Sequence, residues 1–68
     1  MVETILLNGK QQPLAASTVQ ALLEQEEIAE TRGVAVALNG AVVPRAEWPT
    51  TPLKAGDSVE IVRARQGG

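Results

Sequence analysis

The sequence contains no cysteine and no histidine, and Trp48 is its only aromatic residue. Without cysteine the chain can form neither a disulfide framework nor a thiolate nucleophile, and without histidine it lacks the commonest general base and metal ligand. It also has no phosphate-binding glycine motif and no zinc-ligand spacing. The chain thus lacks the side chains that most often carry out catalysis and bind metals. We therefore expect a protein that is not itself an enzyme and that holds no metal.

Long hydrophobic runs and an excess of positive charge are missing as well. No apolar run approaches the roughly 18 residues that a membrane span requires, and the start Met1-Val2-Glu3 lacks the basic region of a signal peptide. The formal net charge of −2 argues against nonspecific binding of nucleic acid. We expect a cytoplasmic protein that binds neither membranes nor nucleic acids.

What the 68 residues do contain is 44% hydrophobic and 21% charged side chains, the composition of an ordinary globular protein. A domain of this size buries only about 60% of the surface that its unfolded chain exposes. We therefore expect one domain over residues 1–64 with a thin aliphatic core and no deep catalytic cavity.

The first half of the chain predicts a hairpin and a helix. Asn8-Gly9, the dipeptide that best supplies positive φ angles, separates strands expected over residues 2–7 and 11–15. Pro13 cannot donate a ladder hydrogen bond, which places the second strand at a sheet edge. Ser17 has Gln20 three residues later, a pattern that predicts a helix N-cap with a capping box. The apolar stripe of this helix is Val19, Leu22 and Leu23, with residues 24–27 facing solvent.

The second half predicts three more strands. The apolar run over residues 34–38 indicates a well-buried strand, either buried on both faces or closely covered, and Asn39-Gly40 joins it to a short strand that ends at Pro44. Residues 45–51 predict a loop or short helical turn, and residues 58–64 a closing strand. The order β-β-α-β-β-β predicts a small α+β fold with one helix across a mixed sheet.

Three residues in this half allow two interpretations. Trp48 fits a hydrophobic lid over the core better than a contact for a partner. Asp57 and Glu60 could form a pair of carboxylates, but turn chemistry and an outward strand position explain them better.

The chain finishes in Gly67-Gly68, two residues after the closing strand. Glycine lacks a Cβ, so a narrow channel in another protein could close around this backbone, and the Gly68 carboxylate could approach the α-phosphate of ATP. A frayed terminus is the alternative interpretation. Positive charge concentrates here: residues 1–62 sum to −4, and Arg63 and Arg65 add two positive charges.

The whole pattern resembles the ThiS-type sulfur carriers of thiamine biosynthesis, which have the ubiquitin-like β-grasp fold. The segments that carry the resemblance are Leu7-Asn8-Gly9, Thr18-Val19-Gln20-Ala21-Leu22-Leu23, Ala37-Leu38-Asn39-Gly40, Val43-Pro44-Arg45 with Trp48, Leu53-Lys54-Ala55-Gly56-Asp57, and Gly67-Gly68. Together they span nearly the whole chain and are specific, whereas each alone is weak.

The resemblance implies a mixed sheet of about five strands, with the first and last strands parallel at its centre. It implies that an E1-like adenylyltransferase consumes ATP to adenylate Gly68, that a persulfide protein supplies sulfur, and that the resulting thiocarboxylate serves a thiazole synthase. No cofactor would be bound permanently. The flexible tail, residues 65–68, would place Arg65, Gln66 and Gly67 in the partner's channel.

The resemblance also implies a partner surface, for which the candidates are Arg45, Trp48 and Arg63. The basic run before the glycines, Arg63-Ala64-Arg65-Gln66, is unusual for this family, and either an acidic partner groove or plain solvation of the charges would explain it. Three other functions stay open: a small subunit of molybdopterin synthase, a ubiquitin-like protein modifier, and a plain β-grasp interaction module.

Overall fold

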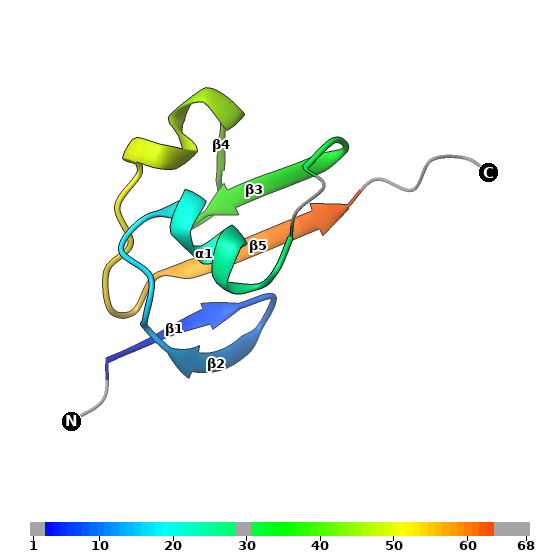
Figure 1. The fold of residues 1–68 in the computed structure, drawn as a ribbon. Helices are drawn as coiled ribbons and strands as arrows, with labels where there is room; N and C mark the ends of the chain where they lie inside the picture. The colour runs from blue at the N-terminus through cyan, green and yellow to red at the C-terminus, as the bar shows by residue number, and fades with distance from the viewer. Residues whose placement is uncertain (1–2, 29–30, 64–68) are drawn as a thin grey trace.

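The computed structural model describes residues 3–28 and 31–63. The elements follow one another in the order shown in Figure 1, and they are β1 (Thr4–Leu7), β2 (Lys10–Pro13), α1 (Val19–Gln25), β3 (Val34–Leu38), β4 (Ala41–Val43), the 3-10 helix η1 (Arg45–Thr50) and β5 (Ser58–Arg63). The predicted tail over residues 65–68 and the domain boundary before it lie outside the described residues.

The five strands form one mixed sheet in the order β2-β1-β5-β3-β4. The last strand, β5, lies at the centre, parallel to β1 on one side and antiparallel to β3 on the other. Helix α1 crosses one face of this sheet (Figure 1). This arrangement is the ubiquitin-like β-grasp fold, and it confirms the α+β class and the central pair of parallel strands.

Both predicted hairpins are present, and their turns are nearly identical. Asn8 and Asn39 each have a φ of 52°, and the glycines that follow have φ of 83° at Gly9 and 88° at Gly40. Two successive positive φ angles define the tight turn whose twist matches a hairpin, and the Asn-Gly dipeptide tolerates them best. Local chemistry therefore fixes the register of both strand pairs.

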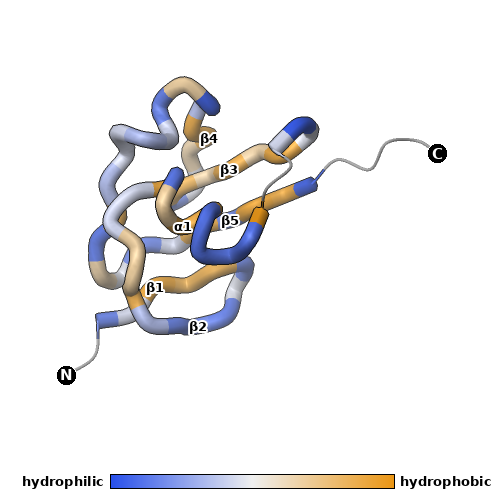
Figure 2. Tube along the Cα trace, viewed as in Figure 1, coloured by the Kyte–Doolittle hydropathy of each residue, from blue (hydrophilic) through white to orange (hydrophobic). Residues whose placement is uncertain are grey.

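Strand β2 lies at the sheet edge, as Pro13 requires, and it pairs only with β1 among the described strands. Its limits, Lys10–Pro13, begin one residue earlier and end two residues earlier than the predicted range of 11–15. Figure 2 shows the hydrophilic character of this edge, which contrasts with the hydrophobic strands beside it.

The prediction that Ser17 caps helix α1 is wrong. The N-cap is Thr18, whose side-chain oxygen accepts a hydrogen bond of 3.1 Å from the backbone N–H of Ala21. The reason is tertiary: the Ser17 carbonyl accepts from the N–H of Leu53, and the Val19 N–H donates to the carbonyl of Thr51. This backbone pairing with a distant segment sets where the helix begins.

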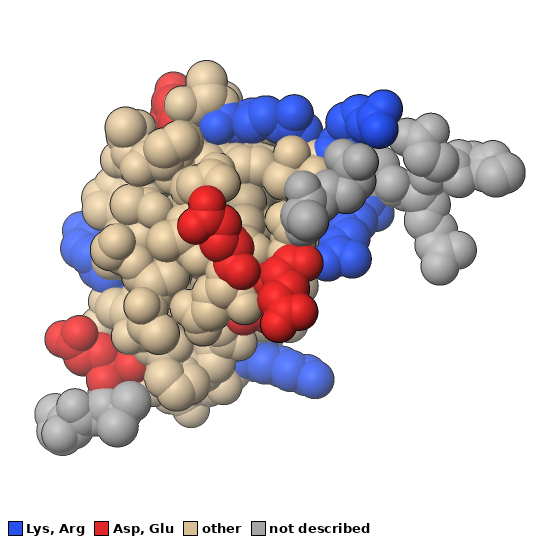
Figure 3. All heavy atoms as spheres, viewed as in Figure 1, with Lys and Arg blue, Asp and Glu red and all other residues tan. Residues whose placement is uncertain are grey.

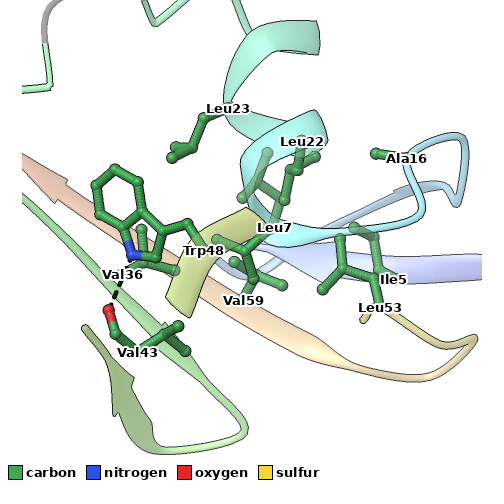
Figure 4. Packing of buried hydrophobic residues seen from close by; sticks show 11 residues of the cluster. Ile5, Leu7, Ala16, Leu22, Leu23, Val36, Val43, Trp48, Leu53 and Val59 are labelled. Carbon is green, nitrogen blue, oxygen red and sulfur yellow. Dashed lines mark hydrogen bonds between the residues drawn. The ribbon is translucent and has the colours of Figure 1, made fainter. Parts of the chain in front are cut away.

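The core lies between α1 and the sheet, and Figure 4 shows most of its side chains. Its most deeply buried members are Ile5, Val19, Leu22, Leu23, Val36 and Val59. The predicted helix stripe is confirmed, since its three side chains are at most 1% exposed.

The prediction that β3 is a well-buried strand, on both faces or under a close cover, is wrong. Only Val36 within this strand is buried, and Ala35 is exposed. With a single main helix available, one sheet face has a cover and the other lies open, and alanine tolerates that exposure because it adds little apolar area. No helix within residues 3–28 and 31–63 is long and apolar enough to cross a membrane.

Candidate functional site

Strand β5 ends at Arg63, the last residue that the structure describes. Strand β5 pairs on both sides: Ser58 and Val59 with β1, and residues 59–63 with β3. The residues that the sequence predicts for activation and for the partner channel lie outside the described residues; they are Gly68, Gly67, Gln66 and Arg65. The structure therefore describes strand β5, which precedes them in the chain, and the residues that hold this strand.

The side chains of the two hairpin asparagines form hydrogen bonds with the backbone of β5. The Asn8 side-chain oxygen accepts a hydrogen bond of 2.8 Å from the backbone N–H of Ile61, and that of Asn39 accepts one of 2.9 Å from Ser58. Both bonds end on β5, far along the chain from either turn. The sequence indicates the turns, but it does not indicate that asparagine is needed there for these longer contacts.

Asp57 is the one charged residue in the described core, and its carboxylate has a structural role. It accepts hydrogen bonds from the side-chain amide of Asn39 at 3.0 Å and from the backbone N–H of Lys54 at 2.8 Å. The bond from Asn39 is the main cause that lowers the pKa of Asp57; burial opposes it, and Lys54 supports it. Glu60 is exposed on β5, and the contacts of Asp57 support the turn interpretation over a pair of catalytic carboxylates.

Trp48 is not part of an exposed partner surface, so that interpretation needs correction. Its side chain is 2% exposed, and its indole N–H donates a hydrogen bond of 2.8 Å to the backbone carbonyl of Val43 (Figure 4). The indole packs into the core from η1. The physical reason is that this aliphatic core needs one large side chain to close the end beside β4.

Arg45 and Arg63, the other two candidates for a partner surface, are exposed. The Arg45 guanidinium lies 5.7 Å from the centre of the Trp48 ring and donates a hydrogen bond to the backbone carbonyl of Thr31. Arg63 is the last residue of β5 and pairs with Val34. Since Thr31 and Val34 lie within four residues of each other, the structure brings Arg45 and Arg63 to the same end of the molecule.

Two further surfaces could meet a partner. The open face of the sheet exposes the large apolar side chains of Leu6, Val42 and Val62, which are 41%, 75% and 60% accessible. An open pocket of about 250 Å³ lies on the other side of β5, and its described lining is Leu7, Asn8, Glu26, Ile28, Ile61 and Arg63. Among the described residues no three metal-ligating side chains come together.

Comparison with known proteins gives one consistent result. The sequence profile of the ThiS family matches residues 5–68. The chain is 42% identical over 64 residues to the sulfur carrier protein ThiS of Thermus thermophilus, covering 94% of this chain and 98% of that protein.

Solved structures agree with the sequence comparison. The crystal structure of the thiamine biosynthesis protein ThiS from Geobacter metallireducens superposes with a TM-score of 0.81 at 35% identity, covering 96% of this chain and 99% of that one. The NMR structure of a thiamine biosynthesis protein from the same organism gives a TM-score of 0.78 at 32% identity, covering 96% and 87%. The fold, the family profile and the extent of identity together show that this chain belongs to the ThiS family.

Proposed function

We propose that the protein is a sulfur carrier of thiamine biosynthesis whose Gly68 carboxylate is converted to a thiocarboxylate. The observation that carries the proposal is that the family match extends through Gly67-Gly68, and that the relative of 42% identity is a sulfur carrier protein of almost the same length. The absence of cysteine fits this role, because the sulfur would be held on the terminal carbonyl carbon rather than on a side chain.

The chemistry would proceed in an E1-like adenylyltransferase. A carboxylate oxygen of Gly68 attacks the α-phosphorus of ATP, and pyrophosphate leaves. The terminal sulfur of a persulfide donor then attacks the acyl carbon and displaces AMP, and a thiol reduces the resulting S–S bond to release the thiocarboxylate. A thiazole synthase accepts that sulfur, and the carrier returns with its carboxylate restored.

The chain's own contribution would be to present its end correctly. Among residues 3–28 and 31–63 no group of three side chains could hold a metal ion, and β5 is held by pairing on both sides and by the side chains of Asn8 and Asn39. A rigid strand that leads into glycines suits entry into a narrow channel, because glycine adds no Cβ to the backbone. The partner would then supply the catalysis.

The thiamine branch is favoured over the molybdopterin branch by the relatives, since the solved structures of similar fold and sequence are thiamine biosynthesis proteins. A protein modifier would use the same activated carboxylate and transfer it to a lysine amine. That function would leave Gly68 in isopeptide bonds on other proteins.

The test is the intact mass of the protein after incubation with ATP, a sulfur donor and extract of the source organism, beside a variant that lacks Gly68. We expect a gain equal to the exchange of one oxygen for sulfur, mapped to Gly68 and absent from the deletion variant. The deletion should leave thermal stability unchanged, since residues at a terminus contribute little packing. An unchanged mass, in extract that converts a known carrier, would contradict the proposal.

A further inference from the structure

Three arginines from separate parts of the chain gather where β5 ends. Arg45 of η1 binds the carbonyl of Thr31, which directly precedes Arg32, and Arg63 pairs with Val34 two residues further on. We call Arg32, Arg45 and Arg63 the basic collar. Figure 3 shows basic side chains clustered at this end of the molecule.

The collar holds half of the six lysines and arginines of a chain whose net charge is −2. All three side chains are exposed, and Arg45 is held in place by Thr31 and by the face of Trp48. Lys54, by contrast, precedes the start of β5 and so lies at the opposite end of that strand. The three arginines thus lie at the end of β5, where the acidic side chain of Glu26 lines the same pocket as Arg63.

The apolar side chains at this end of the sheet lie on a different face from the Arg63 side chain. Val62 is 60% exposed and pairs with the exposed Ala35 on the open face, whereas Arg63 lines the pocket on the other side of β5 together with Ile61. The inference therefore depends on the three arginines and not on this apolar strip. The solvation alternative, which the sequence leaves open, gives no reason for three separate segments to bring arginine to one place.

We propose that the basic collar docks on an acidic rim around the channel of the adenylating partner. The inference rests on the proposed function, because a protein that encloses the residues after Arg63 must approach this end of the molecule. Opposite charges around an interface steer the encounter and fix its orientation. Guanidinium groups suit this task, since they bind carboxylates through two parallel hydrogen bonds.

The test is ATP–pyrophosphate exchange by the purified E1-like adenylyltransferase of the source organism, measured against the concentration of the chain. In the double variant Arg32→Gln and Arg63→Gln we expect about a five- to tenfold higher concentration for half-maximal exchange, with the maximal rate unchanged. Arg45 is left in place because it contacts Trp48. The matched control, Lys54→Gln, removes a positive charge outside the collar and should change the value by less than about twofold.

Salt provides an independent measurement. Between about 0.1 M and 1 M NaCl the Debye length falls from about 10 Å to about 3 Å, so the unmodified chain should need a clearly higher concentration at high salt, and the double variant should respond less. Thermal unfolding of each variant checks that the fold is intact. Equal behaviour of the double variant and the Lys54 control, or an unmodified chain that is insensitive to salt, would overturn the inference.

Failure of the proposed function would look different. If the unmodified chain supports no exchange at all, the adenylation of Gly68 is wrong, and the collar is then tested by calorimetric binding to the same enzyme. Binding that weakens with salt and in the double variant, yet persists when Gly68 is deleted, would keep the collar as a docking surface. Absence of binding would reject both proposals.

Discussion

Asn39 and Asp57 lie 18 residues apart, and the side-chain amide of Asn39 donates a hydrogen bond of 3.0 Å to the buried Asp57 carboxylate. The same side chain accepts a bond from the backbone N–H of Ser58. One asparagine therefore completes the β3–β4 hairpin turn and also fastens it to the turn that precedes β5.

Replacing Asn39 by alanine should lower the free energy of unfolding by about 2 to 4 kcal/mol. The variant loses both side-chain bonds, leaves a buried carboxylate short of a partner, and places alanine at a φ of 52°. Urea denaturation followed by circular dichroism would measure the loss. The control Asn39→Gly keeps the positive φ without strain, so it isolates the side-chain bonds; full stability of that variant would show that they contribute nothing.

The stability of the protein should fall at acid pH in part because of Asp57. The hydrogen bond from Asn39 lowers the pKa of this carboxyl in the folded state, and the unfolded value is about 3.9. Between these two values the unfolded chain binds more protons, so the stabilisation is complete above the unfolded pKa and is lost as the pH falls through the folded one.

Thermal unfolding between about pH 5 and pH 2 measures this dependence. The variant Asp57→Asn cannot titrate at this position and should show a shallower decline than the unmodified protein. Parallel curves for the two proteins would mean that the Asp57 contacts do not depend on its charge.

Substitution of Trp48 should separate the hydrogen bond of the indole from its volume. Trp48→Phe removes the N–H that binds the Val43 carbonyl and should cost about 1 to 3 kcal/mol, whereas Trp48→Ala also leaves a cavity and should cost about 3 to 5 kcal/mol. Far-ultraviolet circular dichroism is the suitable probe, because these variants contain no tryptophan. Equal stability of the phenylalanine variant and the unmodified chain would contradict the role assigned to the N–H.

A methyl group at residue 67 should impair activation if the proposed channel closes on the backbone. We expect Gly67→Ala to slow the sulfur-dependent mass gain by at least about tenfold, because small displacements of a reacting group are costly. Lys54→Ala, which adds no group to the residues expected in the channel and lies before β5, is the control. Normal conversion of the Gly67 variant would show that the channel accepts a side chain there.

Local chemistry is what the sequence predicts best. Both Asn-Gly turns, the edge position that Pro13 requires and the buried stripe of α1 depend on residues close together in the chain, and the structure confirms them. The family resemblance supplied the pairing of β1 with β5, which no local pattern indicates.

The wrong predictions concern places where segments that are far apart in the sequence contact each other. Ser17 and Thr18 both carry a hydroxyl suited to capping, and contacts with Thr51 and Leu53 decide between them. The sequence names Arg45 and Arg63 as candidates for a partner surface, a prediction that stays open, but it gives no local signal for Arg32, whose place near Arg63 follows from the pairing of β3 with β5.

The central position of β5 also affects how the protein is made. Asn8 binds the backbone of Ile61 across 53 residues, and β1 pairs in parallel with β5, so the sheet joins the two ends of the sequence. Contacts of such high sequence separation form late and slow folding. While the ribosome is still making the chain, β1 and β3 lack the strand that lies between them, so the finished sheet can assemble only after β5 has emerged. Folding and delivery of the glycine end are therefore coupled: a molecule that has acquired its native sheet has already synthesised the strand that presents that end.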